Sequence, residues 1–140
     1  MMTSVTPDWT LDQIIDSMKQ YGYEGLEPRA GWGHAAGLET DTPAADRNSA
    51  RAKLEDAGLS ISCVATGARF ATEDASELEG YIEETKKAID LAADMGGTYV
   101  RTFGGARGTG ELRGIVNRTA DAYKRVTDHA AVRGVTVLME

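Results

Sequence analysis

The chain has 140 residues, of which 41% are hydrophobic and 26% charged, and its formal net charge is −7. This composition is typical of one folded domain, and no apolar run approaches the roughly 20 residues of a membrane span. The acidic balance argues against nucleic acid or an anionic membrane as the partner, because neither supplies positive counter-charge. Cys63 is the single cysteine and can form no internal disulfide, and no signal-peptide pattern opens the chain, so we expect a cytoplasmic protein.

The first predicted helix begins at a capping box, Thr10–Gln13, in which each side chain accepts a backbone N–H of the other residue. Gly22 ends this helix. The next segment, residues 23–29, predicts a strand, and a Gly-rich loop follows over 30–45. Residues 3–5 are expected to be the end of a preceding strand. The apolar face of the helix consists of Leu11, Ile14, Ile15, Met18 and Tyr21.

Three more helices follow, and a strand is predicted after each. Every helix has apolar residues at spacings of three and four and ends at a glycine. The predicted elements are a helix over 46–57, a strand over 59–67, a helix from a capping box at Ser76 and Glu79 to Gly96, a strand over 98–105, a helix from Leu112 to Gly134 and a strand over 135–139.

Strict alternation of helices and strands predicts parallel strands joined by helical crossovers. An open doubly wound sheet and a closed (β/α)8 barrel both have this pattern. The Gly-rich segment 104–110 lacks the Lys-Ser/Thr pair of a phosphate loop, which favours the barrel. We therefore expect one α/β domain over residues 1–140 that forms roughly half of a parallel TIM barrel, open and truncated at both ends. The predicted strand centres lie 37 residues apart, at Leu26, Cys63, Val100 and Val137.

Four segments in order, YGYEGLEPR, ISCVATGARF, YVRTFGG and GVTVLME, resemble the N-terminal half of the xylose-isomerase-like TIM barrels, and most closely the sugar phosphate isomerase/epimerase group. The resemblance extends from Trp9 to Glu140. It implies an enzyme of carbohydrate metabolism that removes a proton next to a carbonyl and proceeds through an enediolate. The alternatives are an inosose-dehydratase-like or apurinic-endonuclease-like member of the superfamily, and a non-catalytic barrel fragment that needs a partner. No His stands at the strand ends near Thr66 and Phe103, which disfavours the endonuclease.

The resemblance also implies a divalent metal ion, Mn²⁺, Mg²⁺, Co²⁺ or Zn²⁺, bound by Glu, Asp, His and Glu at the carboxyl ends of the strands. Glu140 matches the first of these ligands, and in the epimerases this Glu also accepts the substrate proton, a role that suits a carboxylate. The other ligands would lie beyond residue 140. We therefore expect the isolated chain to bind metal weakly and to be inactive, because one carboxylate cannot hold such an ion.

Other polar and aromatic residues stand at predicted strand ends or in the loops after them, where barrel sites lie. Arginines there suit sugar hydroxyls or a phosphate, and Phe103 or Trp32 would stack on a sugar. Glu27 also has a structural interpretation, as a salt bridge to Arg29 or Arg101. The expected partner is a small sugar or sugar phosphate, with self-association possible through exposed strand edges. The expected substrate-binding residues are Glu27, Arg29, His34, Arg69, Arg101 and Phe103.

Overall fold

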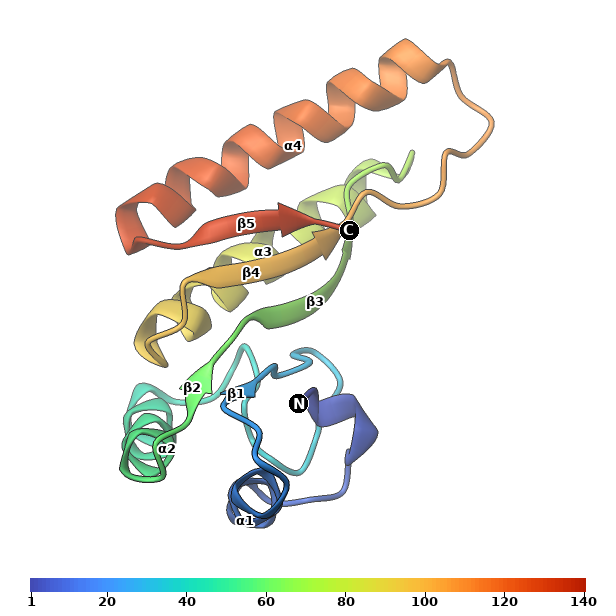
Figure 1. Cartoon of the computed structure of the whole chain (residues 1–140). Coiled ribbons are helices and arrows are strands. Elements are labelled where there is room, and N and C mark those ends of the chain that lie inside the picture. The colour runs from blue at the N-terminus through green and yellow to red at the C-terminus, as the bar shows by residue number, and fades with distance from the viewer.

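The computed structural model describes residues 1–140 as alternating helices and parallel strands (Figure 1). No helix is both long and apolar enough to span a membrane. The helices are α1 (Leu11–Tyr21), α2 (Ala44–Asp56), α3 (Ala75–Asp94) and α4 (Leu112–Arg133). The strands are β1 (Gly25–Leu26), β2 (Ser60–Ile61), β3 (Val64–Arg69), β4 (Tyr99–Phe103) and β5 (Thr136–Met139).

The strands follow one another in chain order and all pair in parallel. β1 pairs with β2, and β4 lies between β3 and β5. The isolated parallel bridge between Arg29 and Ala65 connects the segment after β1 to β3, and a second bridge, between Met2 and Glu27, adds the N-terminal residues beside that segment. In Figure 1, β3, β4 and β5 run the same way and end near the C-terminus, with α3 and α4 outside them. The predicted fold, half of a parallel TIM barrel, is confirmed.

Two predicted strands differ from the structure. The predicted strand over 59–67 is divided into β2 and the larger part of β3, which continues to Arg69. The Ser62 N–H donates to the carbonyl of Leu26 in β1, and pairing with β4 begins at Val64, opposite Val100. The expected strand end at Thr3–Val5 is a 3₁₀ turn, in which the Thr6 N–H donates to the carbonyl of Thr3. The extended pairing there belongs to the two residues before the turn.

The helix ends follow local chemistry, with one correction. The Thr10–Gln13 capping box is confirmed, since the Thr10 hydroxyl accepts the Gln13 N–H and the Gln13 side chain accepts the Thr10 N–H. The capping box at Ser76 is wrong: Asp74 precedes α3 and accepts the N–H groups of both Ser76 and Glu77. One carboxylate oxygen there satisfies two free helical donors. Gly134 ends α4 as predicted, at φ 68°, a conformation that favours glycine.

The core lies between the helices and one face of the strands. Phe70 is fully buried and packs edge-on against Tyr123 of α4, with ring centroids 4.8 Å apart. Tyr21, which was predicted on the apolar face of α1, is instead exposed. Because the helices cover one face only, the opposite, concave face holds the remaining strand side chains. Other fully buried core residues are Ile14, Met18, Leu26, Val64, Ile82, Ile89, Leu91, Val100 and Val126.

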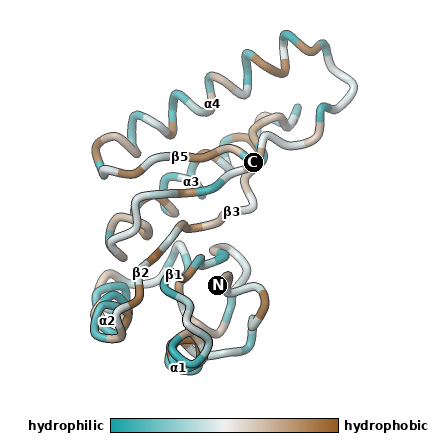
Figure 2. The backbone as a smooth tube through the Cα atoms, in the orientation of Figure 1, coloured by the Kyte–Doolittle hydropathy of each residue, from teal (hydrophilic) through white to brown (hydrophobic).

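The outer edge of β5 is apolar and uncovered. Val116 of α4 and Met139 of β5 are both exposed there, and a hollow of about 400 Å³ lies between the two elements. Figure 2 shows apolar stretches along α4 and β5 at this side of the molecule. An open strand edge of this kind offers unpaired backbone groups to another segment. Self-association through it stays a prediction.

Candidate functional site

Alternation along the strands decides which residues reach the concave face. Val100 and Thr102 of β4 are fully buried on the helix side, where the Thr102 hydroxyl bonds the Tyr123 hydroxyl of α4 at 2.7 Å. Arg101 and Phe103 therefore point to the other face, because neighbouring strand residues alternate. Arg101 pairs in register with Leu138 of β5, so Glu140, two residues further on, lies on the same face as Arg101.

Arg101 connects the ends of three strands. Its guanidinium donates to the carboxylate of Glu140 after β5, and its Nε and Nη2 lie 3.3 Å from Oε1 of Glu27 after β1. The backbone of Glu140 continues the sheet, since its N–H donates to the carbonyl of Thr102 at 2.9 Å. Of the two partners that the sequence left open for Glu27, the structure selects Arg101 and not Arg29. The carboxylate of Glu140 is thus held in place by an arginine.

Three arginines surround the ring of Phe103. The guanidinium carbon lies 5.1 Å from the ring centroid in Arg101, 5.7 Å in Arg69 and 5.9 Å in Arg29. Arg29 also lies over the exposed ring of Trp32, at 4.7 Å. The negative face of an aromatic ring attracts cations. The structure therefore brings four of the predicted substrate-binding residues into one cluster, and Glu27 joins it through Arg101.

Arg29 is the most buried of these arginines, with 8% of its surface exposed. Its Nη1 donates to the backbone carbonyl of Thr66, and its own N–H donates to the Thr3 hydroxyl at 2.9 Å. Burial lowers the pKa of Arg29 from its ordinary value, and the neighbouring charge of Arg101 lowers it further. The guanidinium is still charged near neutrality, because arginine titrates far above that range.

His34 lies in the loop after β1, beside the arginine cluster rather than within it. Its Nδ1 lies 3.0 Å from the Thr3 hydroxyl, and its ring meets Trp32 edge-on. The Glu39 carboxylate accepts the N–H groups of His34 and Gly31 and holds the loop closed. Sequence reasoning missed Thr3 and Glu39, and a lone Thr in a short N-terminal segment and a Glu in a polar loop carry no pattern that would have found them.

Cys63 is half-buried close to Glu27. Burial raises the pKa of its thiol to about 11, and the charge of Glu27 acts in the same direction. A thiol of this kind stays protonated near neutrality and is a poor nucleophile. This environment suits a packing role for Cys63.

The chain by itself does not supply a metal centre. No three His, Cys, Asp or Glu side chains come close enough together to hold an ion. Glu140, the predicted first ligand, has Arg101 as its side-chain partner. A hard divalent cation needs several oxygen or imidazole ligands, so these residues do not fit such an ion without further ligands.

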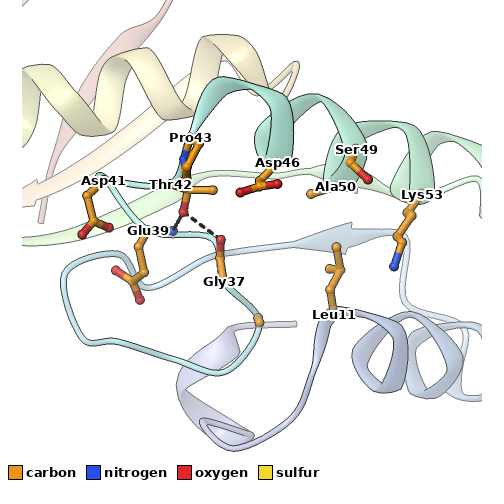
Figure 3. A pocket seen from close by; sticks show the side chains of 11 residues that line it. Leu11, Gly37, Glu39, Asp41, Thr42, Pro43, Asp46, Ser49, Ala50 and Lys53 are labelled. Carbon is orange, nitrogen blue, oxygen red and sulfur yellow. Dashed lines mark hydrogen bonds between the residues drawn. The ribbon is translucent and has the colours of Figure 1, made fainter.

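The largest hollow lies away from the strand ends. It has a volume of about 560 Å³ and is bounded by Leu11 of α1, the loop at residues 36–43 and the first turns of α2 (Figure 3). Figure 3 shows Asp41 and Asp46 at its rim and Thr42 hydrogen-bonded to the backbone of Gly37 and Glu39. Because the Thr42 hydroxyl and the Glu39 carboxylate hold the loop together, and the hollow lies away from the strand ends, we place the candidate site at the arginine cluster instead.

Parallel strands covered by helices on the outside, with charged side chains gathered at the carboxyl ends of those strands, define part of a (β/α)8-barrel domain. The chain belongs to the xylose isomerase-like TIM barrel family, whose model matches residues 15–140. The resemblance inferred from the sequence is thereby confirmed. No curated protein matches the chain.

Several solved structures share this fold at low sequence identity. The 3-keto-D-glucoside 4-epimerase from E. coli is 12% identical, with a TM-score of 0.81, over 99% of this chain and 54% of that one. An L-ribulose 3-epimerase is 19% identical, with a TM-score of 0.77, over 99% and 48%. The IolI protein, solved with a bound zinc atom, is 16% identical, with a TM-score of 0.78, over 99% and 49%. The chain thus spans about half the length of the structures it matches, and at these identities the likeness concerns the fold.

Proposed function

We propose that this chain provides the N-terminal half of a sugar or sugar-phosphate isomerase or epimerase. The observation that carries the proposal is the Arg101 bridge, which holds the carboxylates of Glu27 and Glu140 together at the carboxyl ends of three strands. Membership of the xylose isomerase-like family supports it, as do the two structural neighbours named as epimerases. Because the chain spans half of those neighbours, the remaining half of the barrel would come from further sequence or from a partner.

In the proposed reaction, the Glu140 carboxylate accepts a proton from the carbon next to the substrate carbonyl. The electron pair of the broken C–H bond passes to the carbonyl, giving an enediolate, and return of the proton to a different face or carbon gives the product. Arg101 positions Glu140, and Phe103 offers an aromatic surface to the sugar. A divalent metal belongs to the proposal only with ligands from outside these residues, and no step above depends on it.

Deuterium exchange tests this proposal. The full-length product of the gene is incubated in D₂O with Mn²⁺ and a panel of ketoses and ketose phosphates, and NMR follows deuterium at the carbon next to the carbonyl. We expect exchange and an epimeric or isomeric product with at least one sugar, and a loss of at least about a hundredfold in Glu140→Gln. The matched control is Glu111→Gln, which makes the same change at an exposed position. Equal exchange rates in the two variants would remove Glu140 from the reaction.

A further inference from the structure

We infer that the concave face carries a binding site for an anionic group, the phosphate or carboxylate of a charged sugar, formed by Arg29 and Arg69 beside Phe103. The charged sugar rests on the proposed function. The anion site itself rests on the positions and partners of the arginines.

The arginine cluster is unusual on a protein with this charge. The formal net charge of the chain is −7, yet three guanidinium carbons lie within 6 Å of the centroid of one ring, that of Phe103. Each pair of these carbons is therefore less than about 12 Å apart, and the charges of Arg101 and Arg69 both lower the pKa of Arg29, so the guanidinium groups repel one another. A local concentration of one sign of charge attracts a ligand of the opposite sign.

The carboxylates of the site neutralise only one of the three arginines. Both nearby carboxylates, Glu27 and Glu140, form ion pairs with Arg101. Arg29 and Arg69 take part in none of the ion pairs of the molecule. Arg101 therefore serves as a positioning residue for Glu140, and the other two arginines remain available to a ligand.

Of the two arginines, Arg29 provides the stronger evidence for an anion site. The residue is more than nine-tenths buried and has no ionic partner. A guanidinium has five N–H donors, and that of Arg29 makes one hydrogen bond, to the neutral carbonyl of Thr66. The other guanidinium nitrogens of Arg29 have no hydrogen-bond partner and are not among the fully buried unpaired side-chain atoms, Thr6 Oγ1 and Arg118 Nε, so they are accessible to a ligand. Glu84 is close enough to favour the charged form of Arg29, but it forms no ion pair with it. The stacking on Trp32 fixes the group in one orientation, which suits two-point binding of a phosphate or carboxylate.

Arg69 supplies the second, more accessible charge. It stands at the end of β3 and is exposed, and a hollow of about 230 Å³ lies beside it, lined also by Thr72, Glu77 and Tyr81. The carboxylate of Glu77 disfavours an anion within that hollow. The anionic group is therefore placed on the Phe103 side of Arg69, where Arg29 also lies.

The position of the anion site relative to Glu140 indicates how a ligand would lie across the two. Arg101 lies beside Phe103 and contacts Glu140, so the anion site and the proposed proton acceptor are separated by one side chain. A sugar with its charged end at Arg29 and Arg69 would extend past Phe103 toward Glu140. A neutral sugar would leave the two guanidinium groups without a partner.

The test compares three hexoses that differ in one group: D-glucose 6-phosphate, D-glucuronate and D-glucose. Each is titrated into the ¹⁵N-labelled 140-residue chain at low ionic strength, and the arginine Nε–H and backbone signals report binding. The variant is Arg69→Gln, at an exposed side chain whose loss does not disturb the core. The matched control is Arg113→Gln, which removes the same charge from an exposed position on α4 that forms no ion pair.

We expect at least one anionic hexose to bind at least about tenfold more tightly than D-glucose, to weaken with added salt, and to shift the signals of Arg29 and Arg69. Arg69→Gln should reduce that affinity about tenfold, and Arg113→Gln should leave it unchanged. The more tightly bound of the two anions assigns phosphate or carboxylate. Equal affinity for the neutral and anionic hexoses, or equal affinity in the two variants, would overturn the site.

Anion binding by a full-length protein that fails the deuterium test would support this site and refute the isomerase function. Turnover of neutral sugars without a preference for anionic ones would support the isomerase function and refute the anion site.

Discussion

The ion pair between Glu27 and Arg101 is the best single test of how the strand ends are held together. Its N–O distance is 3.3 Å, and its side chains are 24% and 17% exposed. At an effective dielectric constant of about 20, two unit charges at this distance attract by about 5 kcal/mol. Desolvation and side-chain entropy offset most of that energy, and for a pair that is largely but not fully buried we expect a net coupling of about 1.5–2 kcal/mol.

A double-mutant cycle measures this coupling. The variants are Glu27→Gln, Arg101→Met and the double variant, and the free energy of unfolding comes from urea titrations followed by circular dichroism. The matched control cycle uses Lys124 and Asp121, which are 3.1 Å apart but 76% and 71% exposed, and for which we expect about 0.3 kcal/mol. Because the distances are similar, the difference isolates burial. Equal couplings in the two cycles would refute the argument that Arg101 is a buried structural bridge.

Three further predictions concern the core, a helix end and the cysteine. Replacing Phe70 by Ala removes a fully buried ring that packs on Tyr123 and should lower the free energy of unfolding by about 3–5 kcal/mol, whereas the exposed Leu112→Ala should change it by less than about 1 kcal/mol; similar losses would contradict the packing. Thr10→Ala should cost about 1 kcal/mol in the same urea assay, because the capping box loses an acceptor, and an unchanged midpoint would argue against it. The Cys63 thiol, with its pKa raised to about 11, should react with a disulfide reagent at pH 8 about a hundredfold more slowly in the native than in the urea-unfolded protein. The native rate should rise about tenfold per pH unit and level off only above a pH of about 11, and equal native and unfolded rates at pH 8 would exclude the burial effect.

Part of the candidate site was predictable from position alone. Glu27, Arg101 and Glu140 stand at the ends of predicted parallel strands, and such ends meet at the same edge of a sheet. Their shared face follows from the alternation of strand side chains once the register is known. The contributions of Thr3 and Thr66 were not predictable, because Thr3 acts from a short turn and Thr66 acts through its backbone carbonyl. Neither role depends on a residue type that marks a site.

The sequence by itself determined the order and direction of the elements, because those features rest on interactions within a few residues. The Thr10–Gln13 box begins α1, Gly134 ends α4, and apolar periodicity selects the buried face of each helix. Only the tertiary structure decided which charges pair, since Glu27 and Arg101 are 74 residues apart and compete with nearer partners such as Arg29. That choice depends on strand register and on burial, and it leaves Arg29 without an anion.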